Sequence, residues 1–281
     1  MPSAPVIVLL TALALFAGTA MAQEEDSRGD EDPWAGEGGD EWAEGWGDEW
    51  EDEAGGVVIT GFAELAAGMR ADSEGPVDRR MTLGDARLRA EAEWIGDALE
   101  ANAVGDLWYD AVTRDAEVEV RDLTVAFSPT DDIDVTAGRQ VLTWGTGDLV
   151  FLNDLFPKDF VSFFAGRDDE YLKAPSDTVR VGFYNDLANV DVAWTLRYQP
   201  DEYLTGERFS FFSPQAGQVV APDPPVGAVQ PRRHELALRL YRTVRGVEYA
   251  AYGYDGYFKQ PTAVDADGRL SFAPLRSLGA S

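Results

Sequence analysis

The chain has 281 residues, of which 51 are acidic and 23 are basic, and it contains no cysteine. The lack of cysteine excludes disulfide frameworks, thiol catalysis and cysteine-based metal sites. The net charge of −28 comes without any cluster of cations, so nucleic acid is not expected as a partner, because phosphate binding needs grouped Lys and Arg side chains.

Residues 1–22 have the pattern of a cleavable export signal. An apolar run covers residues 6–17, and Ala20-Met21-Ala22 forms an A-x-A cleavage pattern. This run is too short for a transmembrane helix, and no later apolar run approaches the length of about 18 residues that one requires. We therefore expect a bacterial protein exported across the inner membrane, which must use strands if it enters the outer membrane.

Residues 23–56 form an acidic leader. It has 15 acidic residues between Glu24 and Glu53 against the single Arg28, and its large apolar residues are four tryptophans, Trp34, Trp42, Trp46 and Trp50. Such a segment buries too little surface to offset its chain entropy, so it is predicted to be disordered. One hypothesis makes it a tether for a periplasmic partner or a loose cation trap; the alternative is a solvated leader without a partner.

From residue 57 to residue 281 the sequence alternates in polarity with the period of β-strands. In residues 57–69 the alternating face includes Val57, Ile59 and Leu65, and Glu64 lies on the other face. Further strands are predicted at residues 85–94, 99–109, 117–128, 133–144, 178–184, 190–198, 232–242 and 247–258, with a tenth beginning near Arg269. A change of phase predicts a β-bulge near Arg121.

The connections differ in length according to the edge of the sheet. The links after the second, fourth, sixth and eighth strands are short and rich in turn-forming residues, whereas residues 145–177 and 199–231 are long excursions. Short turns at one edge and long loops at the other are typical of an outer-membrane β-barrel. The predicted fold is therefore an all-β, antiparallel, up-and-down transmembrane barrel, with about ten strands present.

Aromatic residues fall at both predicted ends of the strands. Two belts of aromatic rings at the membrane interfaces are expected in such a barrel. The predicted belt residues are Trp94, Phe127, Tyr184 and Tyr241 at the periplasmic side and Tyr109, Trp144, Tyr198 and Tyr257 at the outer side.

The segment from Ala137 to Gly145, which contains Gly138-Arg139-Gln140 and Trp144-Gly145, resembles the G-R-Q-x-x-x-W-G strand motif of porin-like outer-membrane proteins. It is distantly similar to alginate-export-type porins. The resemblance implies a pore or exporter for small or amphipathic solutes, with Arg139 and Gln140 near the lumen and Trp144 near the outer rim. Strict alternation from Ile133 would instead direct Arg139 outward.

Barrels of this family generally end in a strand that closes on an aromatic residue. This sequence ends in Leu278-Gly279-Ala280-Ser281. We therefore expect a C-terminally truncated member of the family, although a narrow ten-strand barrel is the alternative.

Charged residues on the inward faces are the candidate pore lining. They mix both signs, as expected of a lumen with a transverse field or of salt bridges that fill a wet interior. The predicted set is Glu64, Arg87, Arg89, Glu91, Glu100 and Asp106, to which the resemblance adds Arg139 and Gln140. The run Arg167-Asp168-Asp169-Glu170, inside the long loop, is expected to form a constriction, with an outer Ca²⁺ site as a weaker alternative.

The same loop carries an unusual number of apolar residues, including Phe156, Phe160, Phe163 and Phe164, so it is expected to pack inside or across the mouth of the barrel. The single histidine, His234, lies at the start of a predicted strand, and no G-x-S-x-G motif accompanies it. We therefore predict no enzyme activity, no cofactor and no metal.

The sequence thus favours a passive channel whose partners are outer-membrane lipid and a small solute. The alternative is a secreted β-sandwich binding domain, possibly for carbohydrate.

Overall fold

The protein is all-β. The computed structural model describes residues 10–14, 56–72, 75–77, 79–144, 153–213, 216–222, 227–267 and 269–281, so most of the predicted signal and nearly all of the acidic leader lie outside the described residues. The strands of the large sheet are β1 (Leu10–Ala14), β2 (Val57–Met69), β3 (Met81–Ile95), β4 (Glu100–Asp110), β5 (Asp115–Thr130), β6 (Ile133–Val141), β7 (Pro175–Phe183), β8 (Asn189–Thr195), β11 (Glu235–Val244), β12 (Val247–Tyr257) and β15 (Pro274–Ala280).

Every strand of this sheet pairs antiparallel with its neighbours, and the spatial order follows the chain. Two small hairpins, β9 (Phe211–Ser213) with β10 (Gln218–Val220) and β13 (Ala263–Val264) with β14 (Leu270–Ser271), lie outside the sheet. The up-and-down order is the predicted one. Within the described residues the sheet is open, because its end strands β1 and β15 do not pair with each other.

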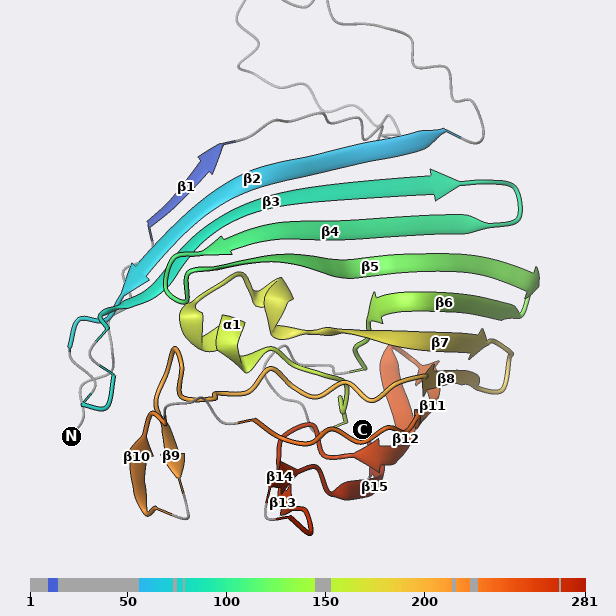
Figure 1. The fold of residues 1–281 in the computed structure, drawn as a ribbon. Helices are drawn as coiled ribbons and strands as arrows, with labels where there is room; N and C mark the ends of the chain where they lie inside the picture. Colours follow the sequence, from blue (N-terminus) through green and yellow to red (C-terminus); the bar gives the residue numbers. More distant parts are fainter. Residues whose placement is uncertain are drawn as a thin grey trace, which may run out of the picture.

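The sheet is strongly curved, and the chain between β6 and β7 lies within the curve (Figure 1). This connection contains the helix α1 (Phe160–Ala165) and the short 3-10 helix η1 (Asp169–Leu172). Neither of them, nor any other helix in the described ranges, is long and apolar enough to cross a bilayer. The curvature gives the sheet an inner, concave face and an outer, convex face.

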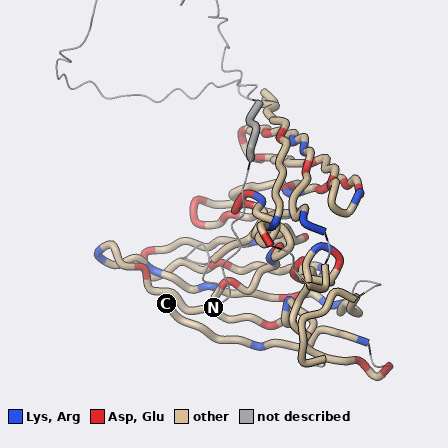
Figure 2. Tube along the Cα trace, turned by 90° about the vertical axis from the view of Figure 1, so that its left-hand side faces the viewer, with Lys and Arg blue, Asp and Glu red and all other residues tan. Residues whose placement is uncertain are grey.

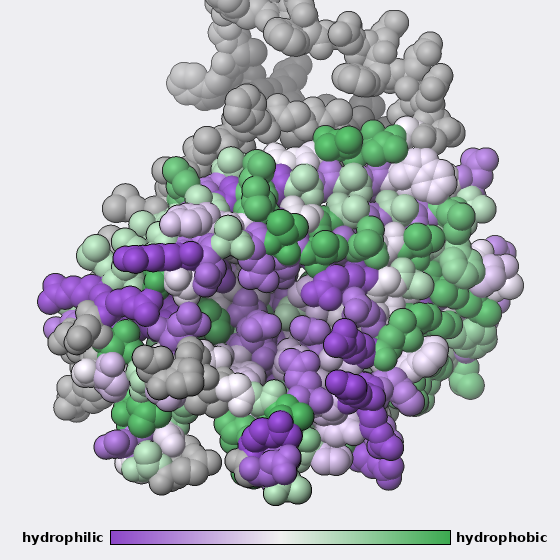
Figure 3. Space-filling model, in the orientation of Figure 1, coloured by the Kyte–Doolittle hydropathy of each residue, from purple (hydrophilic) through white to green (hydrophobic). Residues whose placement is uncertain are grey.

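The two faces differ sharply in polarity. On β4, Asp106 is only 1 % exposed on the inner face, whereas its neighbour Leu107 is 51 % exposed on the outer face. Leu88 on β3 and Leu123 on β5 are also exposed, and their register pairs them with the outward rows of adjacent strands. Figure 3 shows hydrophilic side chains gathered over the central hollow and hydrophobic ones along the upper and right-hand margins. Exposed apolar rows against buried charges reverse the usual arrangement of a water-soluble sheet.

The bulge predicted near Arg121 is confirmed. Val104 pairs with Asp122 and Gly105 pairs with Val120, so Arg121 is the extra residue on β5. Several strand ends differ from the prediction: β6 ends at Val141 and β8 at Thr195, and the tenth predicted strand starts at Pro274 instead of near Arg269. Apolar residues beyond these ends belong to packed loops, which period-two patterning does not distinguish from strands.

The predicted sorting of loop lengths holds with one exception. Residues 96–99, 131–132, 184–188 and 245–246 make the short turns, and the connections 142–174 and 196–234 make long ones at the other edge. The exception is the turn between β4 and β5, which has only four residues and places Arg114 at φ +67°.

Candidate functional site

The centre of the candidate site is the turn-rich segment that contains α1 and η1. Asp159 begins α1 by accepting a hydrogen bond from Ser162 N, and Gly166, at φ +83°, ends it in the left-handed conformation. Asp168 then caps η1 by accepting from Glu170 N. These caps turn the chain within a few residues, so that Glu170 and Tyr171 lie against the inner face of the sheet.

Arg89 and Asp106 form the most buried ion pair on the inner face. Arg89 on β3 donates to both Asp106 oxygens on β4, each at 2.7 Å, which is the bidentate geometry of a strong charge-assisted pair. The Tyr171 hydroxyl joins the pair, donating to Asp106 at 2.9 Å and accepting from Arg89. The loop is therefore joined to two strands through one buried phenol.

Arg87 extends the network by one step along β3. It pairs with Glu64 on β2, and Glu170 of η1 lies 3.6 Å from Arg87 and 2.7 Å from Arg89. Glu91 lies 3.8 Å from Arg89 at the more exposed end. Acidic and basic residues are interspersed along the chain in this way (Figure 2), so that most of the buried charge is compensated locally.

Arg121, the extra residue of the bulge on β5, contacts the segment that contains η1. Its guanidinium donates to the carbonyl oxygens of Glu170 and Lys173, at 3.1 and 3.0 Å. It also lies 4.4 Å from the centre of the Tyr171 ring, which Arg87 approaches to 4.4 Å and Arg89 to 5.2 Å. Each cation–π contact of this kind is worth about 0.5–2 kcal/mol, so the three together hold η1 on the sheet.

Arg167, which lies between α1 and η1, binds the rim of the same face. It donates to Asp85 on β3 at 2.7 Å and lies 3.5 Å from Asp110 at the end of β4. Its guanidinium stacks on Trp108 at 4.6 Å. The predicted packing of the loop inside the curve is thus confirmed. Charged groups make many of the contacts that were expected of the apolar residues, since Phe163 and Phe164 are exposed.

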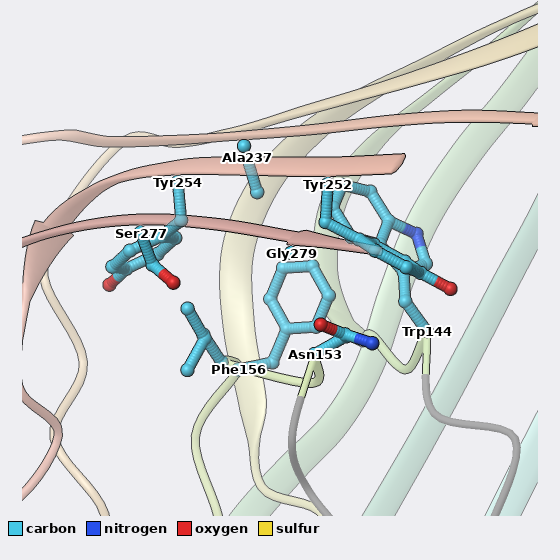
Figure 4. Close-up of a pocket in the computed structure, with 10 residues that line it drawn as sticks. Trp144, Asn153, Phe156, Ala237, Tyr252, Tyr254, Ser277 and Gly279 are labelled. Carbon is cyan, nitrogen blue, oxygen red and sulfur yellow. The ribbon is translucent and has the colours of Figure 1, made fainter. Parts of the chain in front are cut away.

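An apolar anchor holds the beginning of the loop on the opposite side. Phe156 packs edge-on against Trp144 at 5.0 Å, and Trp144 lies 6.3 Å from Tyr252 of β12. Figure 4 shows Phe156 facing the same pocket as Trp144 and Tyr252. These residues belong to the main cluster of buried apolar side chains.

Lys158 joins the connection between β6 and β7 to the connection between β8 and β11. Lys158 donates to Asp154 at 3.1 Å, and its backbone N–H donates to Asp201 at 2.8 Å. Burial lowers the pKa of Lys158, against the opposing effect of Asp154. Burial raises the pKa of Asp201 to about 6, against the opposing hydrogen bond from Lys158.

A cavity of about 470 Å³ lies between β5, the start of α1 and the connection after β8. Acidic residues outnumber basic ones in its wall, and they include Glu117 and Glu119 from β5, Asp159 from the start of α1, and Glu202 from the connection after β8. Desolvation, followed by repulsion from Asp159 and Glu117, raises the pKa of Glu202 to about 7. The charge of this wall therefore changes near neutral pH.

The structure brings together most of the charged residues that the sequence predicted as pore lining. Glu64, Arg87, Arg89, Glu91, Asp106 and Arg167 form the network described above. Asp168 and Asp169 line a cavity next to it. Glu100 stays apart, exposed at the start of β4 and bordering a separate surface pocket.

Arg139 and Gln140 of the G-R-Q strand motif have different surroundings. Gln140 is buried and donates to the Thr178 carbonyl at 3.2 Å. Arg139 lies in register between Leu123 and Asp177 and pairs with Asp177 at 3.3 Å, so it does not join the inner network, although it borders the acidic cavity. Gly138 precedes it at φ +136°, and a Cβ there would lie 2.1 Å from the Leu123 carbonyl oxygen, which explains the glycine.

The residues predicted for the aromatic belts do not all lie on the outer face of the sheet. Tyr109 and Phe127 are exposed on the outer face, and Trp94 shares that face by register, whereas Tyr257 is half-buried against Tyr198. Trp144 and Tyr198 are buried, because β6 and β8 end before them and the chain folds inward.

Two more belt predictions differ in orientation. Tyr241 alternates with the exposed Leu240 and packs toward the interior, and Tyr184 is half-buried just after β7. Trp194 and Tyr249, which the sequence reasoning did not select, are exposed instead.

Sequence reasoning also missed several residues of the inner network. Trp108 and Asp85 could have been found, because they continue the inward rows of Asp106 and Arg87. Tyr171, Lys158 and Asp201 gave no such signal, since they meet the sheet or each other only through tertiary folding.

No group of His, Asp and Glu side chains in the described ranges is arranged to hold a metal ion. No protein-family model matches the chain, and no curated protein matches it significantly.

Proposed function

We propose that this chain is an exported outer-membrane protein that acts as a passive channel for small solutes, with its strands forming the wall of a transmembrane barrel. The observation that carries the proposal is the reversed polarity of the sheet. Leu107 and Leu123 are exposed on one face, while Asp106 and Arg89 are buried on the other. Lipid stabilises such an outer face, whereas water penalises it.

The loop that lies inside the curved sheet supports the same proposal. A loop held by ion pairs inside a charged wall is a means of narrowing a water-filled passage and setting its selectivity. The passage would run beside the network of Arg87, Arg89 and Glu170, because cavities of about 300 and 470 Å³ lie next to it.

The alternative of a β-sandwich gains no support. A sandwich covers the apolar face of one sheet with a second sheet about 10 Å away. In the described part of the chain the other sheets are the two-stranded pairs β9–β10 and β13–β14, and the apolar rows of β3 to β5 stay exposed.

The test is fractionation followed by conductance. The full chain is expected in the detergent-extracted outer membrane, and the purified protein is expected to raise the ionic conductance of planar bilayers. Recovery in the soluble periplasm, or bilayers that stay silent, would contradict the proposal.

A matched pair of variants tests the lipid-facing role directly. Leu123→Arg places a charge on the outer face, where an arginine costs about 2–4 kcal/mol at the bilayer midplane and less toward either interface. Leu187→Arg makes the same change in the exposed turn between β7 and β8. Membrane assembly should fall only for Leu123→Arg; equal behaviour of the two variants would argue against a lipid-facing sheet.

A further inference from the structure

Two cavities flank the polar network that holds η1. The smaller, of about 300 Å³, lies where the segment after α1 meets β2, β3 and β4. The larger, of about 470 Å³, lies between β5, the start of α1 and the connection after β8. In the proposed channel a solute would pass the charges on these walls, so what matters to it is the charge that the ion pairs of the walls leave uncompensated.

Every guanidinium group in the wall of the larger cavity already has a carboxylate partner. The pairs are Arg121 with Glu119, Arg208 with Asp110, Arg139 with Asp177 and Arg167 with Asp85. Two of these partners, Asp85 and Asp177, lie outside the wall, so they neutralise its cations without using any of its own acidic side chains.

Five carboxylates of the same wall have no ion-pair partner within the described residues. They are Asp115, Glu117, Asp159, Glu202 and Glu207. Asp159 is half-buried and accepts a hydrogen bond from Ser162 N, whereas the other four are exposed. A solute in the cavity can therefore reach these groups, and it meets a surplus of negative charge.

The smaller cavity has the same arrangement. Its two guanidinium groups are paired within the wall, Arg87 with Glu64 and Arg167 with Asp85. Asp168 and Asp169 remain, both exposed and without an ion-pair partner in the described part of the chain. In both walls the uncompensated charge of the described side chains is therefore negative.

The ionisation of Glu202 shows independently that the electrostatic potential in the larger cavity is negative. Glu202 faces Asp159 at the start of α1 and Glu117 and Glu119 on β5, with Asp201 beside it. Partial desolvation, followed by repulsion from these carboxylates, raises its pKa to about 7. The charges that act on it most strongly are all negative, although guanidinium groups border the same cavity.

From these walls we infer that the passage selects small cations over anions of the same size. A passage whose wall carries surplus negative charge concentrates cations and repels anions. The charge acts along the passage and not through a coordination site, because no group of His, Asp and Glu side chains in the described ranges is arranged to hold a metal ion. The inference rests on the proposed channel function and names its class of solute.

The test is the reversal potential of the full chain in planar bilayers that separate two dilute KCl solutions of unequal concentration. K⁺ is expected to permeate about tenfold more readily than Cl⁻. A conducting protein with a permeability ratio of one or below would overturn this inference and leave the proposed channel in place. Bilayers that stay silent would contradict the channel itself, so the two failures are distinguishable.

A double variant assigns the selectivity to the larger cavity. Glu117→Gln, Glu202→Gln removes two uncompensated charges, and the ratio of K⁺ to Cl⁻ permeability should fall about threefold or more. Neither side chain has an ion pair to lose in the described structure, so assembly should persist. If this variant does not conduct, Asp115→Asn, Glu207→Gln makes the same change of charge in the same wall and should have the same effect.

Asp131→Asn, Asp132→Asn is the matched control. It also removes two negative charges, but from the short turn between β5 and β6, which borders neither cavity. Its permeability ratio should equal that of the unchanged protein. An equal fall in the two double variants would assign the selectivity to the overall charge of the chain and would overturn the inference.

The pH dependence of the ratio provides a second readout. Cation selectivity should rise between pH 5.5 and pH 8, because Glu202 gains its negative charge in this interval. Glu202→Gln alone should reduce the rise, whereas Glu117→Gln should retain it. An undiminished rise in Glu202→Gln would overturn the assignment of the selectivity to this wall.

Discussion

The loop between β6 and β7 is held at two places on the inner face of the curved sheet, by buried polar groups near β3 to β5 and by apolar packing near β12. On the side of β3 to β5, η1 is held by Arg89, Asp106 and Tyr171, which are polar and buried. On the side of β12, the start of the loop is held by Phe156 and Trp144, which are apolar and buried. Buried ion pairs require every partner to be present, whereas an apolar anchor depends mainly on volume.

The largest effect is expected on the polar side. Asp106→Ala leaves Arg89 as a buried cation without its bidentate partner, which costs about 3–5 kcal/mol of folding stability. Chemical unfolding in detergent measures it. Asp255→Ala on β12 is the control, since Asp255 is mostly exposed, and it should change stability by less than about 0.5 kcal/mol. Similar losses in the two variants would show that the polar anchor does not carry the stability assigned to it.

A loss of about 3 kcal/mol is expected for Phe156→Ala, because the substitution opens a cavity beside Trp144. This loss should not vary with salt, since no charge is involved. Phe212→Ala removes an equally large but exposed ring and serves as the control. If Phe156→Ala were as harmless as Phe212→Ala, the apolar anchor would be disproved.

Tyr171→Phe should have a smaller effect, of about 1–2 kcal/mol, because Arg89 and Asp106 keep each other when the hydroxyl is lost. Limited proteolysis within residues 166–174 is expected to become faster, while the packing of Phe156 on the other side stays unchanged. Faster cleavage at both ends of the loop would mean that the two anchors are not separable.

The smallest effect is expected on the pH dependence of stability where residues 158–160 contact Asp201 and Glu202. The pKa values of Asp201 and Glu202 are raised, to about 6 and about 7, so the folded state binds their protons more tightly than the unfolded state. Their contribution to stability is therefore fully present at low pH and is lost as the pH rises through 6 and 7. Amide exchange should be slower at pH 5.5 than at pH 8, after correction for intrinsic rates, at Lys158, whose N–H donates to the Asp201 carboxyl group, and at Phe160, whose N–H donates to the backbone carbonyl of Glu202.

The double variant Asp201→Asn, Glu202→Gln should remove most of that pH dependence. A dependence that persists in the double variant would assign it to other groups.

Much of the fold followed from the sequence alone. Alternating polarity located the strands, and a single change of phase located the bulge at Arg121, because side chains in a strand alternate strictly between two faces. The same alternation identified Glu64, Arg87, Arg89 and Asp106 as one inward row. The presence of these residues on one face is therefore a property of local sequence.

Only the tertiary structure decided what that row contacts. Tyr171 meets Asp106 across 65 positions of the chain, and Lys158 meets Asp201 across 43, so no local period encodes either contact. The same holds for Trp144 and Tyr198, whose rings would serve equally well at a strand end or in a packed loop. Their burial depends on where β6 and β8 stop pairing, which is set by the competition between backbone pairing and the packing of loops that are distant in sequence.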